Sequence, residues 1–164
     1  MKNILPLFFF PGLIWAHSNW ISIGPMVHLN FGGGKTAFSL ALELAYWSYP
    51  PVYESVNPDA EQGPYTGGPD GIGYGVDAAF EWEIRRGANK LRVYTEPQIG
   101  WDGLRGISLG PVLEIPLNKN PVLFGIQGST WAGFLLGADI RLRYIDSKTF
   151  ICPGLSGKIP LPAD

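Results

Sequence analysis

Long stretches of this sequence alternate between apolar residues and polar or small residues with a period of two. The alternation is clearest in segments 20–31, 36–47, 71–86 and 132–146. In segment 36–47 one set of alternate positions is apolar and the other is small or charged: Phe38, Leu40, Leu42, Leu44 and Tyr46 against Ala37, Ser39, Ala41, Glu43 and Ala45. A period of two places alternate side chains on opposite faces of a β-strand. The pattern therefore predicts strands, and segment 71–86 is far longer than the usual ~5–6 residues of a soluble strand.

Weaker alternation adds further strands. Segments 90–101 and 107–117 alternate despite Pro97 and Pro111, which cannot donate a hydrogen bond within a sheet. Two more candidate strands bring the expected total to eight: 121–130 and 148–158. Short connections with turn-forming residues follow three of the strands: Phe31–Lys35, Arg86–Lys90 and Asn118–Pro121. Strands joined this tightly are antiparallel, so the sequence predicts an all-β, up-and-down β-barrel of eight strands.

Composition agrees with a single all-β domain. The 164 residues suffice for one domain, and 22 glycines with 15 prolines favour turns over helices. Charged residues make up 16% of the chain, against about 25% in an average protein, and the net charge is -2. This balance argues against nucleic acid as a partner. Cys152 is the single cysteine, so an intrachain disulfide and a multi-cysteine metal site are excluded.

Residues 1–16 have the composition of a signal peptide. Lys2 precedes an apolar run that is short for a spanning helix, and Ala16 is an acceptable residue before a cleavage site. We expect residues 17–164 to form the mature barrel domain after export. The alternative is an N-terminal hydrophobic helix that is retained, which Pro6 and Pro11 disfavour.

The apolar side chains of the predicted strands are too bulky to fit inside an eight-stranded barrel. Such an interior is just wide enough for side chains to fill, and the apolar positions include Phe38, Phe80, Trp82 and Phe134. The other faces are rich in Gly, Ala and Ser, so we expect the apolar faces to point outward into a membrane. Aromatic residues near the predicted strand ends would then form an interfacial girdle: Trp20, Phe31, Tyr46, Trp47, Trp101 and Tyr144.

A signal peptide followed by long alternating strands with Gly-rich inner faces resembles the small outer-membrane β-barrels of the OmpA-like type. The resemblance covers most of residues 19–146 and is carried by this pattern, not by a specific motif. It implies an integral protein of the cell outer membrane, folded through the periplasm, with outer-membrane lipid around it.

Charged residues gather on the faces that would point into the barrel. The set is Glu43, Asp77, Glu81, Glu83, Arg85, Arg92, Glu96, Glu114, Asp139, Arg141 and Arg143. Buried charges must pair, because an unpaired one costs several kcal/mol. We therefore expect a salt-bridged plug in the lumen of a barrel with a structural or surface-interaction role. The alternatives are a narrow polar pore and a barrel that binds a small or lipidic ligand.

Residues 48–70 form the longest irregular stretch of the chain. The stretch is rich in Pro, Gly and acidic residues and contains two tyrosines, Tyr53 and Tyr65. Loops of this length are often functional or disordered, so the alternative is a mobile connection without a role of its own. As an exposed loop, it is a candidate for contacts with a surface partner or a small molecule.

Signals for catalysis are weak. A lipid-modifying enzyme would need a carboxylate pair such as Glu81 with Glu83, or a base and nucleophile such as His28 with Ser22, and no nucleophile motif is present. Cleavage after Ala16 would expose His17, and its amino terminus with the imidazoles of His17 and His28 could form a copper site, but a disordered terminus and a lumen-facing or core His28 are the favoured interpretation. We expect no catalytic residues, no cofactor and no metal.

Overall fold

The computed structural model describes residues 19–48, 72–85, 89–101, 103–118, 120–133 and 135–163. The predicted signal peptide, residues 1–16, lies outside the described residues, as do Tyr53 and Tyr65. The regular elements of the described part are all β-strands. Within this part, no helix is long and apolar enough to cross a membrane.

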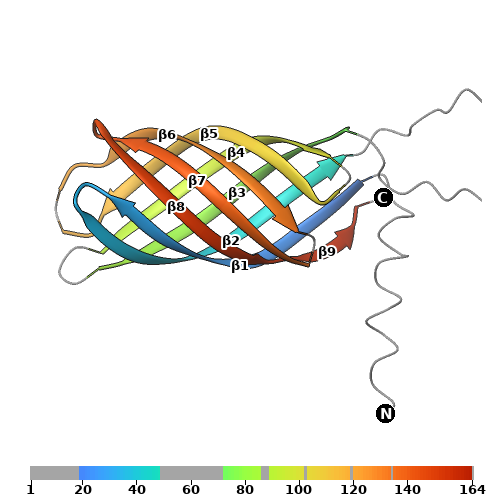
Figure 1. The fold of residues 1–164 in the computed structure, drawn as a ribbon, viewed down its shortest axis with the longest axis horizontal. Helices are drawn as coiled ribbons and strands as arrows, with labels where there is room; N and C mark the ends of the chain where they lie inside the picture. The colour runs from blue at the N-terminus through green and yellow to red at the C-terminus, as the bar shows by residue number, and fades with distance from the viewer. Residues whose placement is uncertain are drawn as a thin grey trace, which may run out of the picture.

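Nine strand segments follow one another along the chain. They are β1 (Asn19–Gly32), β2 (Lys35–Ser48), β3 (Ile72–Ile84), β4 (Lys90–Trp101), β5 (Arg105–Pro116), β6 (Leu123–Gly133), β7 (Leu136–Ile145), β8 (Lys148–Gly157) and β9 (Ile159–Pro162). Consecutive strands from β1 to β8 pair antiparallel, and β1 pairs with β8 as well as with β2. This last pairing closes the sheet into a barrel (Figure 1).

The final two segments, β8 and β9, form one bent strand. Both pair with β1 in the same register, since Met26 lies opposite Ser156 and Ile23 lies opposite Ile159. The bend lies at Lys158, whose N–H donates to the carbonyl oxygen of Leu135 (2.8 Å). The barrel therefore has eight strands, and the all-β antiparallel barrel predicted from the sequence is confirmed.

One predicted strand, 132–146, is wrong because it spans a hairpin. β6 ends at Gly133, β7 begins at Leu136, and Gly133 pairs with Gly137. Three residues separate these partners, so the inward-facing positions stay odd-numbered on both sides of the turn. The alternation therefore runs through the connection without a break and hides it. The predicted segments 121–130 and 148–158 correspond to β6 and β8.

Tight turns join strands at one end of the barrel, which we call the turn end. Gly33 and Gly34 connect β1 to β2 with φ of 57° and 73°, and Asp146 and Ser147 connect β7 to β8 with φ of 52° and 59°. Two consecutive positive φ angles are the geometry of a two-residue hairpin turn. The opposite end, where β1 begins and β9 ends, is the terminal end (Figure 1). β2 ends and β3 begins there, on either side of the predicted loop 48–70.

The apolar faces of the strands point outward, as predicted. Leu42, Phe80 and Leu142 are each more than half exposed, while the neighbouring positions in their strands are buried. A barrel with an apolar exterior and a polar interior is suited to lipid. The predicted aromatic girdle is wrong at Trp20 and Trp47, which are buried. Their positions in the alternation belong to the inner face.

Candidate functional site: the charged lumen

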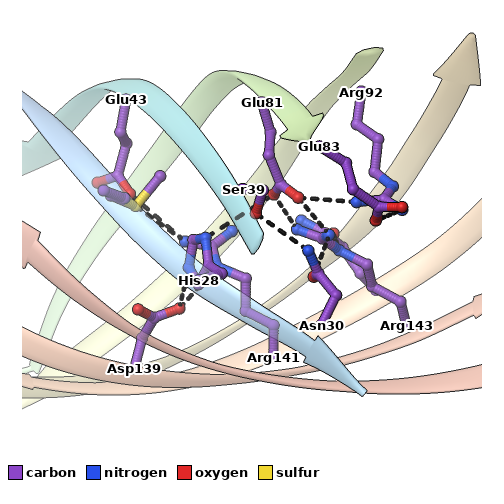
Figure 2. Close-up of polar contacts among 12 residues, drawn as sticks. His28, Asn30, Ser39, Glu43, Glu81, Glu83, Arg92, Asp139, Arg141 and Arg143 are labelled. Atoms are coloured by element: carbon purple, nitrogen blue, oxygen red, sulfur yellow. Dashed lines mark hydrogen bonds and ion pairs between the residues drawn. The ribbon is translucent and has the colours of Figure 1, made fainter. Parts of the chain in front are cut away.

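Charged side chains from strands around the whole barrel meet in its lumen. Figure 2 shows Arg92, Arg141 and Arg143 reaching toward carboxylates that come from other strands. The arginine and carboxylate side chains of these ion pairs are at most 4% exposed. Desolvated charges of this kind are stable only when their hydrogen bonds are satisfied within the protein. The site is therefore built as a network in which each guanidinium serves several acceptors.

Arg92 forms the part of the network nearest the turn end. Its Nη1 donates to Glu81 (2.8 Å), its Nη2 to Glu83 (2.5 Å) and its Nε to Glu114 (2.8 Å). Lys90, at the start of the same strand, places Nζ 2.6 Å from the other oxygen of Glu114. Three neighbouring strands, β3, β4 and β5, are thus joined across their inner faces by one guanidinium.

Arg143 extends the network across the barrel to β7. It forms a two-pronged ion pair with Glu81, in which Nη1 lies 2.7 Å from Oε1 and Nη2 contacts Oε2. Its Nε donates to Gln127 (2.6 Å), and its Nη1 is also 3.3 Å from Asn30 Oδ1. Glu81 therefore accepts from both Arg92 and Arg143, and this carboxylate joins one side of the lumen to the other.

Arg141 holds the half of the network nearer the terminal end. Its Nε donates to Asp139 (2.7 Å) and its Nη1 to Glu96 (3.1 Å), while Nη2 lies 3.5 Å from Glu43. Lys158, at the bend between β8 and β9, places Nζ 2.6 Å from the second oxygen of Glu43. The bend of the last strand thus brings a fifth lumenal cation against a carboxylate of β2.

His28 and Tyr94 lie between the two halves of the network. His28 Nε2 is 3.0 Å from Asp139 Oδ2, and its Nδ1 is 3.9 Å from Glu81 Oε2. The Tyr94 ring lies beneath both central guanidiniums, 4.8 Å from that of Arg141 and 5.6 Å from that of Arg143. Cation–π contacts of desolvated arginine are stabilising, so the buried Tyr94 ring stabilises both guanidiniums.

A tryptophan layer, formed by Trp20, Trp47 and Trp131, lies in the lumen on the terminal side. Trp20 stacks on Trp47 with ring centroids 6.2 Å apart, and Trp131 meets Trp47 edge to face at 5.3 Å. Gly100 leaves room for this layer, since an added Cβ there would lie 3.0 Å from the Trp47 ring. The Lys158 ammonium lies 5.4 Å from the centre of the Trp131 ring. The layer follows the ion network along the lumen, so two kinds of packing fill the interior.

The structure brings together most of the lumenal residues predicted from the sequence. Nine of them take part in the ion pairs above: Glu43, Glu81, Glu83, Arg92, Glu96, Glu114, Asp139, Arg141 and Arg143. Asp77 is buried but forms no ion pair with another described residue. Arg85 lies beyond the end of β3, where its backbone N–H donates to Asn89 Oδ1 (3.0 Å), and it is outside the network.

Lys90, Lys158 and the tryptophan layer were not predicted from the sequence. Lys90 lies on the same face of β4 as Arg92, and the alternation of β8 places Lys158 on the same face as Cys152. Extending the alternation by one step at these strand ends would have found both lysines. Trp20 and Trp47 share the parity of buried neighbours as well, and the preference of tryptophan for interfaces misled the assignment.

The residue pairs considered for catalysis are engaged elsewhere. Glu81 and Glu83 both bind Arg92, and His28 binds Asp139 in place of Ser22. Among the described residues no group of three or more His, Cys, Asp or Glu side chains has the arrangement needed to hold a metal ion. The geometry is that of mutual charge neutralisation.

No protein-family model matches the sequence, and a search of curated proteins found no relative. Among solved structures, a chain from "De novo design of transmembrane beta-barrels" aligns with a TM-score of 0.52 and 10% identity, over 84% of this chain and 95% of that chain. The chain has the fold of a small transmembrane β-barrel. This confirms the fold that the resemblance implied.

Two natural barrels also align at lower scores. Ail, the attachment invasion locus protein of Yersinia pestis, aligns with a TM-score of 0.43 and 13% identity, over 88% of this chain and 99% of that chain. Neisserial surface protein A aligns with a TM-score of 0.44 and 9% identity, over 87% of this chain and 97% of that chain.

Proposed function

We propose that this protein is an integral outer-membrane β-barrel whose lumen is sealed by its own charges, with a structural or surface-interaction role. The observation that carries the proposal is the buried ion network inside an apolar exterior. The exterior is suited to lipid, and the predicted signal peptide would send the chain to the cell envelope. A sealed interior leaves the outer surface and the two ends as the parts that act.

The network supports a plug in preference to a pore because its members are bound on several sides. Arg92, Arg141 and Arg143 each contact at least three acceptors. An ion crossing the lumen would have to break several of these contacts at once, and each buried partner left alone costs several kcal/mol. The tryptophan layer adds an apolar barrier on the terminal side. We propose no catalytic role.

A sealed lumen predicts an electrically silent protein. Mature protein inserted in a planar lipid bilayer should show no discrete conductance steps under applied voltage in concentrated potassium chloride. Heat-modifiable gel migration of the same sample would show that the barrel is folded, and an open porin would serve as the conducting control. Stepwise, cation- or anion-selective currents from folded protein would contradict the plug and establish the narrow pore.

The surface-interaction role rests on the ends of the barrel. The predicted loop 48–70 joins β2 to β3, whose flanking residues Ser48 and Ile72 lie at the terminal end. The two attachment points of the loop therefore lie on the side that also holds the start of β1 and the end of β9. Contacts through Tyr53 or Tyr65 are part of the proposal. Replacing the loop by a short Gly-Ser linker should leave the folded barrel intact while removing such contacts. A barrel that no longer folds would contradict the proposal that the loop serves binding and not folding.

A further inference from the structure

Cationic residues mark the turn end of the barrel. Lysines stand at the first position of three strands that start there, namely Lys35 in β2, Lys90 in β4 and Lys148 in β8. Arg85 follows directly after β3, which ends there. Lys90 forms an ion pair with Glu114 in the lumen. We call the remaining three residues, Lys35, Arg85 and Lys148, the turn-end cations.

Negative charge at this end does not balance these cations. Glu83 and Glu114 are buried and bound to Arg92. The one exposed carboxylate among the described residues is Asp146, which lies 3.0 Å from Lys148 in a solvent-exposed pair. Exposed pairs of this kind hold their partners weakly, so the turn end keeps a surplus of available positive charge.

The depth of the turn end limits what these cations can reach. The last outward-facing residue of β7 is Tyr144, which is exposed, and the turn to β8 follows it. The cation of this turn therefore lies where the apolar exterior ends, which is the level expected for lipid headgroups. The apolar exterior also ends close to the other two cations. Phe38 is exposed near the start of β2, and Ile84 is exposed directly before Arg85.

We propose that Lys35, Arg85 and Lys148 bind the phosphate groups of anionic lipids in the leaflet that the turn end reaches. The proposal rests on the membrane-spanning barrel of the proposed function. Long basic side chains at the edge of an apolar band place their charge among headgroups, and clustered basic residues at a membrane surface attract anionic lipid. The barrel thereby selects its lipid neighbours at one end.

Trp82 provides a native probe for this contact. It faces outward in β3, three residues before Arg85, and its side chain is exposed. The protein would be refolded into vesicles that contain either brominated phosphatidylglycerol or brominated phosphatidylcholine at equal mole fraction, with ordinary phosphatidylcholine as the remainder. Bromine quenches nearby tryptophan fluorescence. We expect at least about twofold stronger quenching by the anionic lipid, a preference that falls as salt is raised.

Variants assign the preference to the turn end. A K35Q/R85Q/K148Q variant should quench equally with both lipids, while Arg105→Gln, which removes an exposed charge at the other end, should keep the preference. Trp82→Phe should remove most of the difference if the lipid binds near Arg85. Equal quenching in the wild type, or equal loss in Arg105→Gln, would overturn the lipid proposal. Failure to form a heat-modifiable barrel in any vesicle would instead overturn the membrane barrel on which it rests.

Discussion

Among the described glycines, Gly24 is the one whose replacement by alanine should destabilise the barrel most. A Cβ at Gly24 would lie 1.6 Å from the carbonyl oxygen of Gly157 and 3.0 Å from the Cα of Lys158. These are backbone atoms of the strand that closes the barrel, so no side-chain rotation can relieve the clash. β1 and the bent β8–β9 strand would have to separate at the closing seam, at a cost of about 3 kcal/mol or more.

The measurement for Gly24→Ala is the urea midpoint of unfolding in lipid vesicles, with the fraction of heat-modifiable protein as a second readout. Gly157→Ala is the matched control, because it adds the same methyl group to the other partner of the same contact. A Cβ at Gly157 has no neighbour nearer than 3.9 Å, so this variant should unfold close to the wild-type midpoint. Equal midpoints for the two variants would show that the seam is not the tight point of the closure.

The alternation of the sequence was sufficient to predict the sides of the strands. In β2 and β3 it separated the outward residues, such as Leu42 and Phe80, from the inward Glu43 and Glu81 without any knowledge of the partner strands. This succeeds because side-chain direction in a strand is a local property with a period of two. The outward orientation of the apolar face also followed from the volume of its side chains.

The contacts of the lumen could not be predicted in the same way, because they join residues that are distant in sequence. Arg143 reaches Asn30 across a separation of 113 residues and Glu81 across 62. Alternation says that these side chains point inward, but the height at which each one enters the lumen depends on the tilt and stagger of all strands together. For the same reason the sequence could not show that Asp77 would form no ion pair with another described residue or that Trp47 would join a tryptophan layer.

The network predicts a second large effect, at Arg143. Replacing it by methionine should lower the free energy of unfolding by about 3–5 kcal/mol, because Glu81 would lose its two-pronged partner while remaining buried. Methionine keeps much of the volume of the side chain, so a cavity should contribute little. Gln127 would also lose its hydrogen bond to Arg143 Nε. The urea midpoint in vesicles measures the effect, as for Gly24→Ala.

Two further variants distinguish the effect of leaving a buried carboxylate without its partner from the general effect of losing a positive charge. Lys148→Met removes a cation whose pair with Asp146 is exposed, and its effect should stay within about 0.5 kcal/mol. Adding Glu81→Gln to Arg143→Met removes the orphaned carboxylate and should recover part of the stability, although Arg92 then loses one of its acceptors. The contrary result would be a double variant that is less stable than Arg143→Met by as much as Glu81→Gln alone destabilises the wild type. The two residues would then act independently. The lumen would then be filled by separate ion pairs, and the seal could be opened one pair at a time.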